Sequence, residues 1–295
     1  MRGYFTYISY RLIGALAGRL PPPIAYRLAG WVGFLAYLFY PRLRRNLSHN
    51  MRHVLGPAAD RKRLQAVVRQ ACVNIIKSHY DLFRVPRLTP EEIQALTRME
   101  GTEHLDRALA RGRGVVIISP HFGNVDIVLQ ISQVHRMPLT TVVQHIRPER
   151  LFRYVLGLRT SHGLRMIPSD EPMLPLFRAL KRGEMIGLAC DRDVTDNARE
   201  VEFFGSPTRL PDGPVQVALR TGAALVPAYA LRLPDNSFLV QIEPPLELSQ
   251  TGDWETDVVA GMKQVVAFME RPIARHPEQW LVTMPIWPLN SRPAR

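Results

Sequence analysis

His121 and Asp126 are the residues whose types and spacing best fit catalysis, and both lie in the segment 119–126. A carboxylate bonded to one imidazole nitrogen fixes the tautomer and stabilises the imidazolium, while the other nitrogen accepts a proton from a hydroxyl. The pair therefore predicts a general base that activates an alcohol. A plainer interpretation stays open, in which His121 caps a helix and Asp126 completes the cap, because short motifs recur by chance.

The place of this pair in the chain favours catalysis. Residues 115–118 form an apolar run that predicts a β-strand, and functional groups in open α/β sheets gather beyond the carboxyl ends of strands. Asp126 would then lie in the first turn of a following helix, where the helix dipole favours a carboxylate. Side chains five residues apart diverge on a continuous helix, so the turn must curl back for the two to meet, which Gly123 permits.

The chain beyond residue 100 alternates between apolar strands and amphipathic helices. Such alternation predicts an α/β fold with a mostly parallel central sheet flanked by helices. A weak boundary near residue 90 divides an N-terminal helical, membrane-associating region, residues 1–90, from an α/β core, residues 91–295. We expect strands at 115–119, 139–143, around 166, 185–190, 223–231 and 238–242, and helices at 123–134, 148–158, 171–181, 214–220 and 253–276.

The first 40 residues predict two short helices separated by the prolines at 21–23. Residues 24–40 are apolar apart from one arginine, and Arg42, Arg44 and Arg45 follow at once. Because this stretch is shorter than the ~20 residues of a typical span, it predicts a helix that lies in the membrane interface or inserts obliquely. A buried core helix is the alternative. From residue 60 onward, apolar residues at three-four spacing predict an ordinary packed helix.

The charge balance requires an anionic partner, a solvated basic face, or both. The net charge is +12 at pH 7, and 46% of the residues are hydrophobic, which is ample for a sizeable core. Nucleic acid is disfavoured, because the arginines stand beside apolar residues and the sequence has no zinc-finger or RNP-type motif. An anionic membrane surface explains the charge at least as well. Cys72 and Cys190 lie far apart in apolar surroundings, which predicts buried, reduced thiols.

Other reactive groups have less weight. Asp191 and Asp193 imitate a metal-binding Asp-x-Asp, yet a lone tripeptide of this kind after a strand is more often a polar loop. Ser119 beside His121 would suit a serine hydrolase, but the Gly-x-Ser-x-Gly elbow is missing. The remaining candidate metal ligands are His135, His145 and His162. Their spacing does not fit a metal site, so we predict no bound metal.

Several blocks resemble one family in order and spacing. The bacterial lipid A biosynthesis acyltransferases and their actinobacterial relatives, the phosphatidylinositol mannoside acyltransferases, carry a His-Phe-Gly-Asn-x-Glu/Asp block that is similar to residues 121–126. Asp126 stands where the lipid A enzymes usually have Glu, so the chain is more similar to the mannoside branch. The resemblance covers nearly the whole chain and includes residues 45–47, 191–193, 201–205, 213–214, 221–227 and 276–280.

The resemblance implies transfer of a fatty acyl group from acyl-CoA or acyl carrier protein to a hydroxyl of a glycolipid, such as a phosphatidylinositol mannoside. His121 would deprotonate the hydroxyl, Asp126 would orient His121, and the alkoxide would attack the thioester without a covalent acyl-enzyme. Backbone amides near Gly123 and Asn124 would stabilise the oxyanion. No cofactor is implied. We expect a peripheral or monotopic protein on the cytoplasmic face of the cell (inner) membrane.

Three charged residues are secondary candidates. Glu200 is similar in position to an acidic active-site residue of the mannoside enzymes, and would supplement Asp126; the alternative is a solvated charge before a strand. Arg159 and Arg192 would bind phosphates of CoA or of the acceptor headgroup. Each arginine also fits a structural ion pair.

Two other functions stay open. A glycerophospholipid or lysophospholipid acyltransferase uses a similar His-x-x-x-x-Asp pair, usually without the Phe-Gly-Asn filling. A noncatalytic peripheral lipid-binding protein would use its arginines for anionic lipid, while His121 only capped a helix. An assay of the acceptor headgroup separates the first from the leading hypothesis, and the second predicts lipid binding that survives His121→Ala without thioester turnover by the parent.

Overall fold

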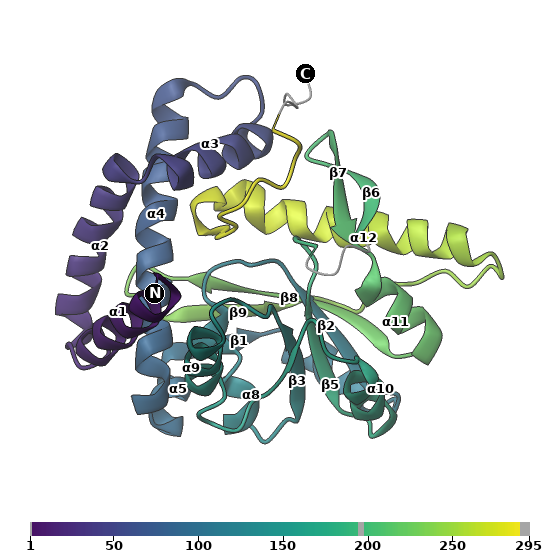
Figure 1. Ribbon diagram of the computed structural model, residues 1–295. Helices are drawn as coiled ribbons and strands as arrows, with labels where there is room; N and C mark the ends of the chain where they lie inside the picture. Colours follow the sequence, from purple (N-terminus) through teal and green to yellow (C-terminus); the bar gives the residue numbers. More distant parts are fainter. Residues whose placement is uncertain (1, 194–197, 290–295) are drawn as a thin grey trace.

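The computed structural model describes residues 2–193 and 198–289, with a seven-stranded sheet at its centre (Figure 1). The strand order is β1-β9-β8-β2-β5-β3-β4, and every neighbouring pair is parallel except β8 and β9. The predicted α/β fold with a mostly parallel sheet is confirmed. The strands are β1 Thr97–Glu100, β2 Val115–Ser119, β3 Leu139–Val143, β4 Arg165–Pro168, β5 Met185–Ala189, β8 Ala224–Arg232 and β9 Phe238–Ile242, and a separate antiparallel hairpin joins β6 Ala198–Phe203 to β7 Ser206–Pro211.

Helices cover both faces of the sheet (Figure 1). Alternate residues of β2 point to opposite faces, as a strand requires: Val116 and Ile118 pack in the core that includes α12, whereas Val115 and Ile117 pack on the other side with α6. The helices of this region are α5 Pro90–Leu96, α6 Thr102–Leu109, α7 Val125–Val128, α8 Ile131–Val134, α9 Glu149–Arg159, α10 Leu174–Lys181, α11 Gly213–Thr221 and α12 Trp254–Arg275.

Four helices precede this layer: α1 Arg2–Ala17, α2 Pro22–Phe39, α3 Pro41–Leu55 and α4 Arg61–Arg84. The side chain of Asp60 caps α4 by accepting from the Arg63 amide at 2.6 Å. α4 packs against α1, α2 and α3 and also reaches α7 and the short 3₁₀ helix Pro277–Gln279. Among the described residues, none of the helices combines the length and apolar composition that a bilayer span needs.

Hydrophobic periodicity placed most elements correctly, with one clear error at the helix expected over 123–134. The structure has two short helices there, α7 and α8. The Gln130 side-chain amide donates to the Asp126 carbonyl at 3.0 Å, which the Gln130 backbone amide would bond in a continuous α-helix. The Gln130 backbone amide donates to the Ile127 carbonyl instead. This exchange ends α7 after one turn. Strand β1, helices α3 and α6 and the β6–β7 hairpin carried too weak a pattern to be predicted.

The last described segment returns to α3. Asn50 is fully buried; its side-chain amide donates to the carbonyls of Val282 at 3.2 Å and Met284 at 2.8 Å, and its carbonyl accepts from the Ile286 amide at 3.0 Å. One side chain thus satisfies three backbone groups that would be costly to bury unpaired. The predicted buried, reduced state of Cys72 and Cys190 is confirmed.

Candidate active site

His121 meets Asp191, not Asp126. β2 and β5 are parallel neighbours with Ser119 opposite Ala189, so His121 and Asp191 each lie two residues beyond the same register pair. Asp191 Oδ1 accepts from His121 Nδ1 at 2.7 Å, and Asp191 Oδ2 accepts from the His121 amide at 2.7 Å. Two neighbouring strand ends therefore deliver the imidazole and the carboxylate to one point.

The environment of Asp191 keeps it ionised. Its side chain is fully buried, which by itself raises a carboxyl pKa, but His121 and the indole Nε1–H of Trp280, donating at 2.8 Å, lower the pKa of Asp191 below its ordinary value of 3.8. An ionised Asp191 accepts the Nδ1–H, which leaves Nε2 of His121 as the basic nitrogen. Nε2 has no hydrogen bond to any residue that the structure describes.

The predicted contact between His121 and Asp126 is not formed. Asp126 lies in α7, and its Oδ1 accepts from Arg159 Nε of α9 at 2.7 Å. The helix start turns the carboxylate away from the imidazole, as expected for side chains five residues apart, and Asp126 raises the pKa of Arg159. The Asp126–Arg159 pair is only partly buried and lines the same cavity as His121.

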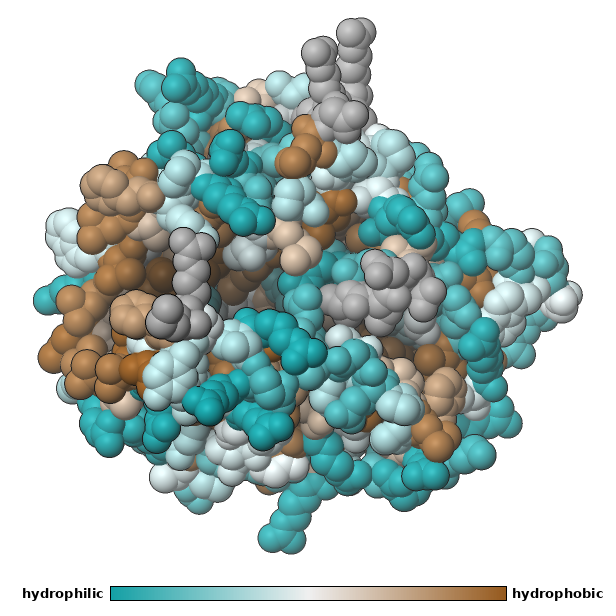
Figure 2. All heavy atoms as spheres, viewed as in Figure 1, coloured by the Kyte–Doolittle hydropathy of each residue, from teal (hydrophilic) through white to brown (hydrophobic). Residues whose placement is uncertain are grey.

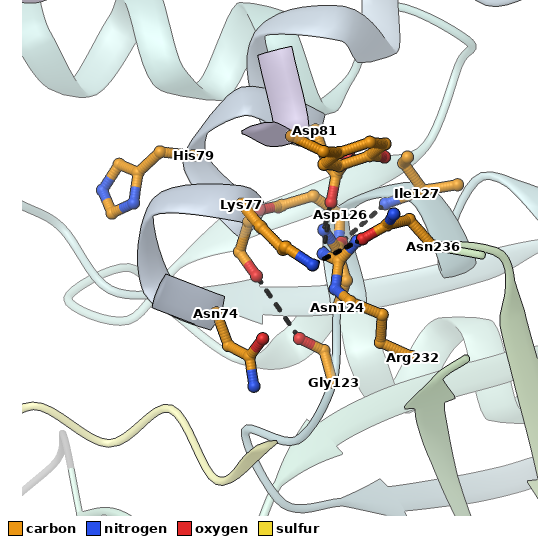
Figure 3. Close-up of polar contacts among 12 residues, drawn as sticks. Asn74, Lys77, His79, Asp81, Gly123, Asn124, Asp126, Ile127, Arg232 and Asn236 are labelled. Atoms are coloured by element: carbon orange, nitrogen blue, oxygen red, sulfur yellow. Dashed lines mark hydrogen bonds and ion pairs between the residues drawn. The ribbon is translucent and has the colours of Figure 1, made fainter. Parts of the chain in front are cut away.

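Asn124 lies in the turn between His121 and Asp126, and its side chain holds that turn in place (Figure 3). Its side-chain oxygen caps α7 by accepting from the Asp126 amide at 2.8 Å and the Ile127 amide at 3.1 Å, and its side-chain amide donates to Asp81 Oδ2 at 2.7 Å. Asp81 comes from α4 and also accepts from the Tyr26 hydroxyl at 2.6 Å and from Arg232. The Asn124 side chain therefore serves the scaffold.

Gly123 is required by its backbone. Its φ is +63°, and a Cβ at this position would lie 1.8 Å from the Ala230 carbonyl oxygen. The turn through Gly123 is therefore tight, as the sequence allowed, but it does not bring Asp126 to His121 as predicted. Its amide donates to the Gln279 carbonyl at 2.9 Å, so this N–H is already bonded, and an oxyanion role for the Asn124 amide stays a prediction.

A cavity of about 610 Å³ extends from His121 along the sheet. Its polar end is formed by His121, Asp126, Arg159 and Arg192. Its far wall is apolar and comes from five strands of the sheet; these residues include Ile117, Leu139, Met185, Ala228, Val240 and Ile242. A charged mouth above an apolar cavity fits an amphiphile whose hydrocarbon tail points inward.

The secondary candidates divide between cavity and surface. Arg192 lines the cavity and donates to Gln144 Oε1 at 2.7 Å, but its buried Nε has no partner among the described residues. Burial lowers the pKa of Arg192; the Asp191 charge opposes this effect, and the Arg159 charge adds to it. The structure thus brings both arginines together near His121. Glu200 lies exposed on β6 opposite Arg209 and is not among the residues that line the cavity.

Helix α1 forms part of the cavity wall. Tyr10 lines the cavity, and its ring packs edge-on against Phe83 at 5.0 Å and Tyr154 at 6.3 Å. Burial, followed by the nearby Asp126 charge, raises the pKa of Tyr10. The opposite face of α1 is exposed and apolar, and includes Leu12, 60% exposed. One helix therefore separates the cavity from an outer apolar surface.

That apolar surface continues over α2. Of the nineteen large hydrophobic side chains that are exposed among the described residues, fourteen belong to residues 4–40. Figure 2 shows brown, hydrophobic atoms gathered at the left, where Figure 1 places α1 and α2. Trp31 is 66% exposed and Phe39 77% exposed. An apolar surface of this kind marks a site of contact with membrane or protein.

Sequence reasoning missed two residues of this site. Asp191 was interpreted as part of a polar loop, and Trp280 was noted only within the similar block 276–280; Trp280 is fully buried and its indole N–H donates to Asp191. A usable signal existed, because Asp191 follows an apolar strand just as His121 does. The sequence does not show, however, that β5 lies beside β2. This strand order is what brings Asp191 into contact with His121.

Comparisons with known proteins agree on one family. The model for bacterial lipid A biosynthesis acyltransferases matches residues 1–288. A phosphatidylinositol mannoside acyltransferase of Mycobacterium tuberculosis is 34% identical over 215 residues, which are 70% of this chain and 66%, a little under two thirds, of that protein. A phosphatidylinositol mannoside acyltransferase of Mycolicibacterium smegmatis is 30% identical over 83% of this chain and 79% of its own length. A lipid A biosynthesis lauroyltransferase of Escherichia coli is 25% identical over 95% of this chain and 90% of its own length.

Proposed function

The chain belongs to the bacterial lipid A biosynthesis acyltransferase family, and from this premise we propose that it transfers a fatty acyl group from an acyl thioester to a hydroxyl of a glycolipid. The observation that carries the proposal is the basic Nε2 of His121, which stands at the polar end of an apolar cavity with Asp191 behind the ring. The thioester carrier is acyl-CoA or acyl carrier protein. The named relatives favour a phosphatidylinositol mannoside as acceptor.

The reaction follows from this geometry. The acyl chain lies in the apolar cavity, where each buried methylene contributes about 0.8 kcal/mol. His121 Nε2 takes the proton of the acceptor hydroxyl as the oxygen attacks the thioester carbonyl, and Asp191 stabilises the imidazolium. The C–S bond then breaks, an ester forms, and the thiolate leaves with the proton that His121 returns. No acyl-enzyme is formed.

The two arginines that line the cavity would stabilise the oxyanion and bind the substrate phosphates. The unpartnered Arg192 Nε lies at the cavity and suits either the oxyanion or a phosphate of the substrates. Arg159, oriented by Asp126, presents a second guanidinium to the same phosphates. These assignments replace the Gly123 amide as oxyanion donor.

Membrane association is part of the proposal. The apolar outer face of α1 and α2 would lie in the interface, and the cavity, whose wall includes Tyr10 of α1, would then lie next to the lipid. A lipid acceptor would then reach His121 without leaving the membrane surface. The protein would be peripheral or monotopic, on the side of the cell membrane where the thioester donors are made.

Thiol release from palmitoyl-CoA tests the proposal. Purified protein would be assayed with and without phosphatidylinositol mannoside, a lysophospholipid or a lipid A precursor, and mass spectrometry would identify the acylated product. We expect acceptor-stimulated release that His121→Ala reduces by about 10²–10⁴-fold, whereas the exposed His135→Ala control keeps the parent rate. Release that His121→Ala leaves unchanged would contradict the mechanism, and acylation of only the lysophospholipid would select the glycerophospholipid alternative. If the parent releases no thiol, an acyl carrier protein donor is assayed next; no turnover with either donor would favour the lipid-binding alternative.

A further inference from the structure

A second cavity, of about 590 Å³, lies between α3, the start of α4 and Leu289. It shares none of its lining residues with the His121 cavity. Five basic side chains line it and no carboxylate does; we call it the arginine cleft, and these residues are Arg44, Arg45, Arg52, Arg61 and His49. A concave site of several guanidinium groups fits an anion with several acceptor oxygens.

The charges of the arginine cleft are not neutralised internally. Within the part of the chain that the structure describes, none of its four arginines forms an ion pair with a carboxylate. Asp60, which adjoins Arg61 in sequence, accepts from the Arg63 backbone amide. Arg44 is held in place, since it donates to the Tyr37 carbonyl at 3.2 Å and lies over the Tyr37 ring at 5.6 Å.

The distribution of charge along the chain supports the same conclusion. The first 80 residues hold thirteen of the 38 lysines and arginines but only one of the 26 acidic residues. The whole net charge of +12 therefore belongs to these 80 residues, and the remaining 215 are electrically balanced. At long range, an anionic partner would therefore be attracted chiefly to the helices α1–α4.

The neighbours of the arginine cleft identify that partner as lipid. One of its lining residues, Tyr37, belongs to α2, and Phe39 and Tyr40, two and three residues further along the chain, are exposed. Figure 2 shows hydrophilic atoms over α3 directly above the apolar surface of α2. A phospholipid offers charge and hydrocarbon at this spacing and would use both the basic groups and the exposed apolar side chains, whereas a soluble anion would use the basic groups alone.

We propose that the arginine cleft binds the phosphate-bearing headgroup of an anionic phospholipid, separate from the acyl acceptor. The bound headgroup would fix how the molecule lies on the membrane, with α1 and α2 against the bilayer and the mouth of the His121 cavity at its surface. The inference rests on the proposed function, in that it takes the protein to work at a membrane.

Vesicle binding by the full chain tests the cleft. The affinity would be measured for vesicles of phosphatidylcholine and of phosphatidylcholine mixed with phosphatidylglycerol. The cleft variant carries Arg45→Gln, Arg52→Gln and Arg61→Gln, and the control loses the same charge from exposed residues elsewhere, through Arg111→Gln, Arg178→Gln and Lys181→Gln. We expect stronger binding to the anionic vesicles and a loss of about 5-fold per cleft arginine, roughly 100-fold in all, with the control equal to the parent.

Three results would overturn the proposal. Equal losses in the cleft variant and the control would show diffuse attraction by net charge. Displacement from vesicles by glycerol 3-phosphate at the same phosphate concentration would assign the cleft to a soluble phosphate. Loss of affinity for acyl carrier protein without loss for vesicles would assign it to an acidic protein. Because vesicle binding requires no acyl donor, these results are independent of whether the parent transfers an acyl chain.

Discussion

Two fully buried carboxylates flank the segment 121–126, and their partners differ. Asp191 meets His121, whose side chain is 34% exposed, whereas Asp81 meets Arg232, which is 4% exposed. Burial raises the pKa of Asp81, and Arg232, Tyr26 and Asn124 offset this only in part, while His121 and Trp280 bring the pKa of Asp191 below its ordinary value.

The difference shows how one kind of residue serves two purposes. The partner of Asp191 keeps a free nitrogen at the cavity, so its charge can stabilise a proton that arrives during a reaction. The partner of Asp81 is sealed between the Tyr26 and Phe238 rings, at 5.7 Å and 4.8 Å. We therefore expect Asp191 to control activity and Asp81 to control stability.

The largest effect is expected from Asp191→Asn. Loss of the carboxylate removes what orients His121 and stabilises its imidazolium, so kcat should fall by about 10²–10⁴-fold, and the acidic limb of the pH–rate profile should move to lower pH. Thiol release measured across pH checks this, with the exposed Asp106→Asn as control. Because the pKa of Asp191 is lowered, the stability it contributes is present above pH 3.8 and is lost as pH falls through the lowered pKa. A parent-like profile for the variant would contradict the assignment.

Asp81→Asn should act on the free energy of unfolding instead. It leaves the Arg232 charge buried without a counter-ion, which costs about 3–5 kcal/mol. Urea unfolding measures the loss, and the variant that remains folded should retain a parent-like pH–rate profile. A shifted profile would place Asp81 in the chemistry and remove the contrast with Asp191.

Asp126→Asn tests a third carboxylate against these two. The substitution removes the charge from a partly buried hydrogen bond to Arg159, so we expect a loss of about 2 kcal/mol in the free energy of unfolding. We also expect a raised KM, while the acidic limb of the pH–rate profile should not move. Parallel urea and pH–rate measurements separate these effects. If the limb moved as in Asp191→Asn, then His121 would turn to Asp126 during turnover, as the sequence first suggested.

The smallest effect is expected from Tyr26→Phe. The variant keeps the ring and removes only the hydroxyl that donates to Asp81 at 2.6 Å, which should lower the free energy of unfolding by about 1 kcal/mol. The exposed Tyr4→Phe provides the matched control. A loss as large as that of Asp81→Asn would mean that Tyr26, and not Arg232, is the main support of the carboxylate.

The sequence predicted the sheet well because its strands are apolar runs bounded by turns, a local property. Residues 115–119 and 238–242 are examples in which both ends were correct. The break between α7 and α8 was not local in this sense, since it depends on the Gln130 side chain, which also bonds the Arg159 carbonyl at 3.0 Å from another helix.

The site was predicted in part for the same reason. His121 was found from its place after a strand, and Arg159 and Arg192 from their chemistry. The choice between Asp126 and Asp191 as the partner of His121 depends on the order of strands and on the direction of a helix start, neither of which spacing along the chain encodes. Asp81 was missed because nothing in an ordinary packed helix marks a buried carboxylate.

The bonds of Asn50 have a consequence for the timing of synthesis. Its three partners lie 232 to 236 residues further along the chain, so at ribosomal rates they emerge roughly 10–50 s after Asn50 itself. Throughout that interval α3 lacks the segment that covers it, however complete the sheet has become. The closure of α3 thus has to wait for residues 282–286, and a nascent chain halted before Val282 would leave the Asn50 side chain without any of its three backbone partners.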